Sequence, residues 1–298
     1  MAAPLRTKSR WQTLVHRTKI AGKSGRRWLD WMLKPDEYPP PRLAAEEPAF
    51  PTVAWRHSAP IVRTAPDAQP LYEEGKLHNL RLAQPSFDGL LLSPDRVFSF
   101  WRTLGEASLA RGFRYGMELQ GGCVVPAVGG GICMLSNALF RMAVELGFSI
   151  VERHGHSVSA VPLAPGETWG LDATVFYPYV DLRFVPTVPV RLGMNVSADR
   201  LVIEARTEQP LPVKVTVQSA AEGHERQGVD EYRTNRLVRL RFVDEQLVGE
   251  ETIAENRKRL LHPEEPGRSC LTCGDTACQM RPKDLPSLIR QNDLHRRP

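Results

Sequence analysis

The sequence predicts an α+β protein in which a central helix packs on mostly antiparallel strands and the C-terminal section is rich in β-structure. Two patterns lead to this prediction. Apolar residues recur at helical spacing over residues 132–146, and Gly147 follows as a C-terminal stop. Beyond Pro186, short apolar runs separated by turn residues continue to residue 253, which is typical of antiparallel strands.

The pattern divides the chain into four parts. Residues 1–51 are a basic leader and an extended, proline-rich connector, because six prolines between positions 35 and 51 exclude a regular helix. Residues 52–185 form the core, residues 186–260 a β-rich extension, and residues 261–298 a cysteine-containing tail.

Within the core, the predicted elements follow one another closely. A helix or buried turn is expected within 71–91, a strand or aromatic wedge at 97–101, and a short helix at 106–111 closed by Gly112. The predicted strands cover residues 148–153, 158–161, 173–177, 181–184, 190–194, 201–205, 213–217, 237–242 and 247–253.

Composition excludes several protein classes. The 298 residues are 42% hydrophobic and 24% charged, which favours neither general disorder nor a membrane bundle. No run of about 18 to 20 apolar residues occurs, and the N-terminus has no signal-peptide pattern. An odd number of cysteines, five, in such a chain argues against a disulfide framework. We therefore expect a cytoplasmic protein with reduced thiols.

The net charge of +5 derives mainly from the leader, where basic residues alternate with tryptophan and aliphatic residues over positions 1–34. One interpretation is an interfacial helix that attaches the protein peripherally to anionic lipid at the inner membrane face. The charge would also suit a nucleic-acid backbone, although we expect no nucleic-acid partner. The alternative is a leader that packs its tryptophans on the domain.

The candidate chemical centre is Cys133, which follows Gly129, Gly130 and Gly131 at the start of the 132–146 helix. Glycines permit unusual backbone dihedrals and close approach to main-chain amides. Unpaired amides and the helix dipole favour an anion at a helix N-terminus, so a thiolate would be stabilised there. These residue types predict a nucleophilic cysteine.

A base for Cys133 is available in His154 or His156. The helix covers roughly 22 Å at about 1.5 Å per residue, and an extended return to residue 156 covers about 30 Å. An antiparallel return would therefore bring the histidines near the helix N-terminus. Asp172 or Asp181 on the following strands could orient the imidazole, as in a catalytic triad.

Three other interpretations of this segment remain open. The glycine loop could bind an anion through its amides without chemistry. The glycines could form a tight turn with Cys133 as a small buried hydrophobe. Finally, Cys133, His154 and His156 could bind zinc, because two histidines two apart on a strand face the same side.

Six motifs occur in the order in which a known family has them. They are residues 94–101 (PDRVFSFW), 116–119 (GMEL), 128–133 (VGGGIC), 152–157 (ERHGHS), 173–177 (ATVFY) and 181–184 (DLRF). On these motifs the chain resembles the VanW family, strongly from about Leu71 to Phe184 and more loosely to about Arg257. The resemblance implies an accessory role in glycopeptide resistance or cell-envelope metabolism, with D-alanyl peptides or lipid-linked wall precursors as the ligand class.

The resemblance also bears on individual residues. The family motif continues with glutamine where this chain has Met134, so an oxyanion donor would have to be the backbone amide of Cys133 or Met134. One family member has glycine at the position of Asp172 but keeps the counterpart of Asp181, which favours Asp181 as the orienting carboxylate. The candidate ligand-binding residues are Gly129, Gly130, Gly131, Glu152, Arg153 and Ser157.

The tail places Cys270, Cys273 and Cys278 within nine residues, a spacing that suits zinc or an iron–sulfur cluster. A fourth ligand would have to be His262, Asp275 or Cys123. A redox dithiol or an exposed tail without chemistry are the alternatives.

Three functions follow from these features. The first is a cysteine-dependent hydrolase or acyltransferase acting on a peptidoglycan-type peptide. The second is a non-catalytic binding or scaffold module for an anionic wall precursor. The third is a thiol-based metal or redox site protein that uses the tail.

Overall fold

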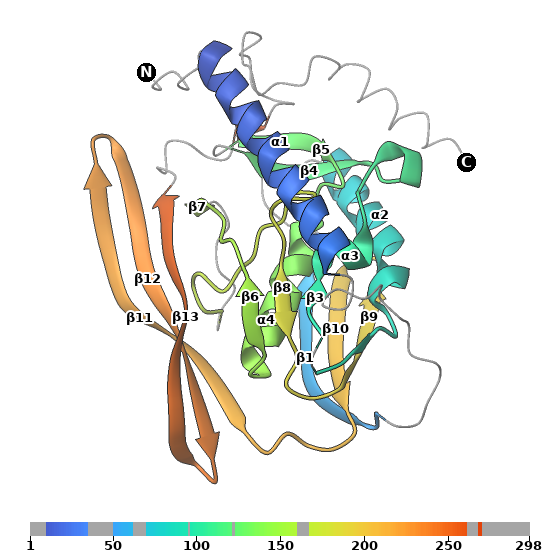
Figure 1. Ribbon diagram of the computed structural model, residues 1–298, viewed down its shortest axis with the longest axis vertical. Coiled ribbons are helices and arrows are strands. Elements are labelled where there is room, and N and C mark those ends of the chain that lie inside the picture. The colour runs from blue at the N-terminus through green and yellow to red at the C-terminus, as the bar shows by residue number, and fades with distance from the viewer. Residues whose placement is uncertain are drawn as a thin grey trace.

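The computed structural model describes residues 10–34, 50–61, 70–94, 96–120, 123–159, 167–260 and 268–269. Over these residues the fold is mixed α+β and rich in strands (Figure 1). Most of the proline-rich connector and the tail cysteines lie outside the described residues, so the predictions made for them stay predictions.

Four α-helices and one short 3₁₀ turn occur in the described parts of the chain. They are α1 (Arg10–Leu33), α2 (Pro70–Phe87), α3 (Phe100–Leu104), the 3₁₀ turn η1 (Leu109–Arg111) and α4 (Cys133–Glu145). None of the described helices is long and apolar enough to cross a membrane.

The strands form four small sheets. The first has the order β1 (Thr52–Pro60), β10 (Arg200–Thr207), β9 (Val190–Val196), β2 (Leu91–Leu92), and the second β11 (Lys214–Gln227), β12 (Asp230–Val243), β13 (Gln246–Leu260), β7 (Val158–Ser159). The third is β14 (Arg268–Ser269), β5 (Cys123–Val128), β4 (Tyr115–Gln120), and the fourth β3 (Phe98–Ser99), β8 (Arg183–Val185), β6 (Ser149–Glu152). Pairing is antiparallel except for β13 with β7 and β14 with β5.

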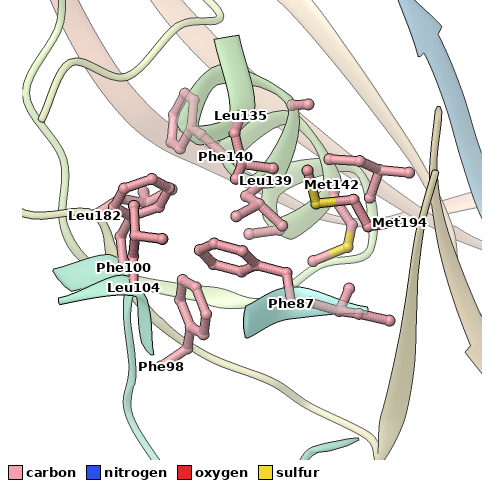
Figure 2. Packing of buried hydrophobic residues seen from close by; sticks show 14 of the residues in the cluster. Phe87, Phe98, Phe100, Leu104, Leu135, Leu139, Phe140, Met142, Leu182 and Met194 are labelled. Carbon is pink, nitrogen blue, oxygen red and sulfur yellow. The ribbon is translucent and has the colours of Figure 1, made fainter. Parts of the chain in front are cut away.

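The hydrophobic core contains aromatic residues of the short elements, most of α4 and alternate residues of β9 and β10 (Figure 2). Phe98 and Phe184 stack with ring centroids 4.5 Å apart, and Phe87 and Phe100 lie 5.4 Å apart. Burial of aromatic rings supplies much of the stabilising area in a domain of this size. Strands β3 and β8 have only two and three residues, so they form few hydrogen bonds to each other. We therefore expect the aromatic contacts to stabilise the fourth sheet.

Helix α4 begins at Cys133 and contacts strands β1, β6, β10 and β11. Leu135, Leu139 and Met142 are fully buried, as their helical spacing predicts. Gly147 has φ +79°, a left-handed conformation that ends the helix where the sequence predicted its end.

One sequence prediction was confirmed in part and two were wrong in detail. The aromatic segment 97–101 is a two-residue strand that turns into α3, because the Ser99 hydroxyl accepts a hydrogen bond from the Arg102 amide and caps the helix. The predicted helix 106–111 is reduced to η1. Residues 173–177 are not a regular strand, since the Ala173 amide bonds to the Asn137 side chain instead of a neighbouring strand.

The second sheet differs from the rest of the molecule. Its strands β11, β12 and β13 are much longer than the strands predicted at 213–217, 237–242 and 247–253. They extend to one side of the domain (Figure 1). Part of this sheet packs on the core through Val217 and Ile253. Leu237 and Val238 of β12 are also buried. Near its other end, β13 runs beside β7 and so reaches the region that follows His156.

Candidate functional site

Cys133 is the first residue of α4 and is half-buried. Its Sγ lies 3.8 Å from Thr174 Oγ1, and it is also a hydrogen-bond partner of the His156 ring. The thiol therefore lies between the helix N-terminus and the segment that contains His156. It is neither sealed in an apolar core nor remote from a base.

His156 links Cys133 to Asp172. The imidazole Nδ1 lies 2.6 Å from Asp172 Oδ2, and the same carboxylate oxygen accepts a hydrogen bond from the His156 amide at 2.9 Å. Because Nδ1 is engaged by the carboxylate, Nε2 is the ring nitrogen left for the thiol. Cys133, His156 and Asp172 thus have the order nucleophile, imidazole and carboxylate found in catalytic triads.

The Asp172 carboxylate is held between cations. Its Oδ1 lies 2.5 Å from Lys258 Nζ and 3.3 Å from Arg153 Nη2. Burial raises the pKa of Asp172, but the hydrogen bond from His156 and the charges of Lys258 and Arg153 lower it more, so that the pKa lies well below its ordinary value. Asp172 is therefore ionised at any physiological pH.

The His156 imidazole is the basic member of the group. Burial lowers its pKa, yet the hydrogen bonds with Asp172 and Cys133 and the charges of both groups raise it to about 9. At neutral pH the ring is an imidazolium. An imidazolium can donate its proton to a leaving group.

The three glycines before Cys133 are required by close packing. A Cβ on Gly130 would lie 2.3 Å from the carbonyl carbon of Gly116, and a Cβ on Gly131 2.2 Å from Lys76 Cγ. Gly129 and Gly131 also have φ values of +78° and +95°, which favour glycine. Protein atoms therefore explain all three glycines without an anionic ligand.

A buried amide fixes the glycine loop. Asn79 Nδ2 donates to the carbonyls of Arg114 and Gly130, at 2.9 and 3.0 Å, and Asn79 Oδ1 accepts from the Arg114 amide.

The Met134 amide donates to the Gly131 carbonyl at 3.0 Å. Of the two backbone donors suggested by the sequence, the Cys133 amide is thus the better candidate for an oxyanion.

His154 does not share the position of His156. Its side chain is about half exposed, and its Nε2 lies 3.3 Å from Glu152 Oε1. Residues 153–156 are not a regular strand, and the two histidine rings contact different carboxylates, His154 that of Glu152 and His156 that of Asp172. Within the described residues, no group of three or more His, Cys, Asp or Glu side chains is arranged to bind a metal.

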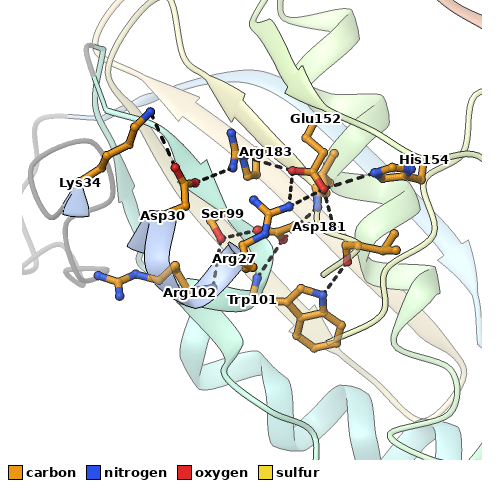
Figure 3. Close-up of polar contacts among 12 residues, drawn as sticks. Arg27, Asp30, Lys34, Ser99, Trp101, Arg102, Glu152, His154, Asp181 and Arg183 are labelled. Carbon is orange, nitrogen blue, oxygen red and sulfur yellow. Dashed lines mark hydrogen bonds and ion pairs between the residues drawn. The ribbon is translucent and has the colours of Figure 1, made fainter. Parts of the chain in front are cut away.

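Glu152 belongs to a second polar cluster (Figure 3). Arg27 of α1 forms a hydrogen-bonded ion pair with its carboxylate at 2.5 Å, and the Asp181 amide donates to it at 3.1 Å. Burial raises the pKa of Glu152, but the hydrogen bonds from His154 and Arg27 lower it to about 2. Glu152 therefore attaches α1 to the core and lies apart from the Cys133 thiol.

Asp181 lies in the same cluster and not beside His156, which reverses the expected preference between the two aspartates. Its carboxylate is fully buried and accepts hydrogen bonds from Ser99 Oγ at 2.5 Å and the Trp101 amide at 3.1 Å. The resemblance to a family member that lacks Asp172 could not reveal this, because the positions of Asp172 and Asp181 depend on the irregular segment between them.

Arg153 and Ser157 also have structural partners. The Arg153 guanidinium donates to the carbonyls of Asp172 and Gly170, both at 2.6 Å, and to Asn256 Oδ1 at 2.7 Å. The Ser157 carbonyl accepts from the Arg259 amide at 2.9 Å, while its side chain is exposed. Arg153 therefore holds the 170–172 segment in place.

Sequence reasoning missed Thr174, Asn256 and Lys258. Thr174 contacts the thiol, Asn256 orients Arg153, and Lys258 pairs with Asp172. The last two come from β13, far from the glycine loop in sequence. Their only local signal is that polar residues alternate along a strand, which is ordinary for a solvent-facing sheet.

Comparison with known proteins identifies similarity to one family over part of the chain. Residues 75–206 match the model of the family described as VanW like protein. Over these residues the chain is similar to the VanW family. This range contains Cys133, His156 and Asp172 and ends within β10. It does not include the long sheet formed by β11, β12 and β13, of which β13 carries Lys258.

Two curated relatives match part of the chain. The vancomycin B-type resistance protein VanW of Enterococcus faecalis is 35% identical over 114 residues, 38% of this chain and 42% of that protein. The uncharacterized protein YoaR of Bacillus subtilis is 32% identical over 111 residues, 37% of this chain and 35% of that protein. The chain therefore spans less than half the length of either relative. No solved structure matches the chain.

Proposed function

We propose that this VanW-family chain is a thiol-dependent hydrolase or acyltransferase in which Cys133 is the nucleophile, His156 the acid and base, and Asp172 the orienting carboxylate. The observation that carries the proposal is the continuous contact from Asp172 through His156 to Cys133. Cys133 lies at the start of α4, the His156 ring is bonded to Asp172, and Asp172 is paired with Lys258 and Arg153. The thiol is partly exposed.

The proposed reaction forms and breaks one thioester. The Cys133 thiolate attacks a carbonyl carbon, and the negative oxygen of the tetrahedral intermediate is stabilised by the Cys133 amide at the N-terminus of α4. The His156 imidazolium gives its proton to the departing amine, which leaves an acyl group on Cys133. Water or another amine then attacks the thioester, loses its proton to His156 and releases the thiolate.

Asp172 would act through His156 and not on the substrate. Its bond to Nδ1 would leave Nε2 as the ring nitrogen for the thiol, and its charge would stabilise the imidazolium. Lys258 and Arg153 in turn fix the carboxylate, each through an ion pair. Lys258 of the long sheet would thereby stabilise a centre whose three principal residues, Cys133, His156 and Asp172, lie within residues 75–206.

The proposed substrate class is a peptide-like compound of the cell envelope, such as a D-alanyl wall peptide, and the proposed role is an accessory one in glycopeptide resistance. This assignment is supported by the name of the Enterococcus faecalis relative, a vancomycin B-type resistance protein. We place the reaction on the cytoplasmic side of the membrane.

The test has two measurements. Incubation with a wall-type peptide that ends in D-alanyl-D-alanine should give peptide cleavage or transfer, with an acyl adduct on Cys133 seen by mass spectrometry. Cys133→Ala and His156→Gln should abolish turnover, whereas Asp181→Asn serves as the buried-carboxylate control. Peptide binding that survives in Cys133→Ala, without turnover in the wild type, would instead support a binding module.

Thiol reactivity tests the same centre without a substrate. Iodoacetamide should label Cys133 at neutral pH at least tenfold faster in the wild type than in His156→Gln, because the imidazolium stabilises the thiolate. Peptide mapping separates this label from those on the other cysteines. A wild-type rate equal to that of a free model thiol would contradict the proposal.

A further inference from the structure

Helix α1 has two unlike faces. On its inner side Trp31 is buried in the core, and Arg27 and Asp30 form ion pairs with Glu152 and Arg183 (Figure 3). These contacts attach the helix to the family region, in agreement with the alternative that the leader packs a tryptophan on the domain. They account for only one side of the helix.

The outer side of α1 presents an apolar stripe. Its members lie at helical spacing near the C-terminal end of α1, and their exposed fractions are 46%, 49%, 66% and 70% for Trp28, Leu29, Met32 and Leu33. Four large apolar side chains left this exposed on two adjacent turns form a patch of the kind that marks an interaction surface.

A row of cations adjoins the stripe. Lys19, Lys23 and Arg26 are exposed and recur every three or four residues, so they share one side of α1. Arg26 is three residues before Leu29, which brings the row to the edge of the stripe. The sole acidic residue in the sequence of α1 is Asp30, and its carboxylate lies 3.2 Å from Arg183.

We infer that the outer face of α1 is a docking surface for an anionic lipid bilayer, with the helix lying in the plane of the interface. Apolar side chains beside a row of Lys and Arg are the pattern of interfacial helices, which bury the stripe at the headgroup level while the cations meet anionic headgroups. A phosphate backbone would use the cations but leave the apolar stripe in water.

The long sheet offers a comparison that separates charge from hydrophobicity. Val229, Leu247 and Val248 are 78%, 55% and 58% exposed at its hairpin turns. The turn before Leu247 is Asp244–Glu245, so its charge would repel an anionic surface. These side chains therefore provide a matched apolar control.

The experiment is co-sedimentation of the full-length chain with vesicles of phosphatidylcholine, with and without an equal amount of phosphatidylglycerol. We expect binding to the anionic vesicles alone, and weakening of that binding as salt is raised. Met32→Gln with Leu33→Gln should reduce the affinity at least tenfold. The matched control, Leu247→Gln with Val248→Gln, should bind as the wild type does.

The cations are tested separately. Replacement of Lys19, Lys23 and Arg26 by Gln should also weaken binding at least tenfold, since each cation near an anionic surface contributes about a fivefold effect. The same replacement at the exposed Arg56, Arg81 and Arg226 should change it little. Circular dichroism and an unchanged unfolding midpoint establish that the variants are folded.

Four results would overturn the inference. They are no sedimentation with anionic vesicles, equal binding to neutral ones, α1 variants that bind like the wild type, and duplex DNA binding that displaces the vesicles and is unaffected by Met32→Gln with Leu33→Gln. Light scattering that shows a dimer, made monomeric by the same variant, would assign the stripe to a second copy instead.

Discussion

The carboxylates of Asp172 and Asp181 belong to neighbouring clusters, but they receive different hydrogen bonds. Asp172 is paired with Lys258 and Arg153 and bonds to His156. Asp181 bonds to the neutral donors Ser99 and Trp101.

Burial raises the pKa of both groups, and the neighbouring charges decide the outcome. The pKa of Asp172 lies well below its ordinary value, because His156 and two cations favour its charge. The pKa of Asp181 is raised to about 6 by burial, and the nearby charge of Glu152 raises it further, against the hydrogen bonds of Ser99 and Trp101. Only the first is suited to hold an imidazolium.

The largest expected difference is in stability. Asp172→Asn leaves two buried cations without their carboxylate, and loss of one partner from a buried pair costs about 3 to 5 kcal/mol. Asp181→Asn keeps an oxygen acceptor and removes a buried charge, so a cost of about 1 kcal/mol is expected. Urea unfolding at neutral pH compares the two. Equal losses would show that the cations around Asp172 contribute no more than the neutral donors around Asp181.

The second difference concerns alkaline pH. The His156 pKa rises from 6.5 to about 9 on folding, so the folded state binds this proton more tightly. Its contribution, about 3 kcal/mol, is complete below pH 6.5 and is lost as pH rises through 9. The free energy of unfolding of the wild type should therefore approach that of His156→Gln over this window. A constant difference between the two proteins would contradict the raised pKa.

The smallest expected effect is on the free energy of unfolding at acidic pH. The Asp181 pKa rises from 3.8 to about 6 on folding, so the proton it binds stabilises the folded state fully below pH 3.8, and this contribution is lost as pH rises through 6. Relative to Asp181→Asn, the wild type should lose about 2 to 3 kcal/mol between these values. Chemical unfolding of both proteins at several pH values measures the difference. A wild type that gains stability relative to Asp181→Asn as the pH rises would contradict the raised pKa of Asp181.

The family region and the long sheet also contribute differently to the site. Residues 75–206 supply the thiol, the imidazole and the orienting carboxylate, whereas β13 supplies Lys258 and Asn256. A chain with the family motifs but another C-terminal section would need other partners for Asp172 and Arg153. The motifs therefore point to the side chains of the proposed centre, but they do not predict the residues that hold Asp172 and Arg153 in place.

The sequence by itself determined the α+β class, helix α4 and its end at Gly147, the position of Cys133 at the start of that helix, and the similarity to the VanW family over part of the chain. These follow from spacing, glycine conformation and short motifs, which are local properties of the chain. The elements of the short sheets were predicted less well, because stacked rings such as Phe98 on Phe184, and not strand propensity, stabilise them.

Only the tertiary structure decided which histidine and which aspartate join Cys133. Residues 153–156 and 171–175 are irregular, so no periodicity assigns their side chains to a face. Their positions are set by Arg153, which binds two carbonyls of the 170–172 segment, and by Lys258 from a distant strand. Such long-range ion pairs and hydrogen bonds depend on how the sheets pack, so no local pattern in the sequence predicts them.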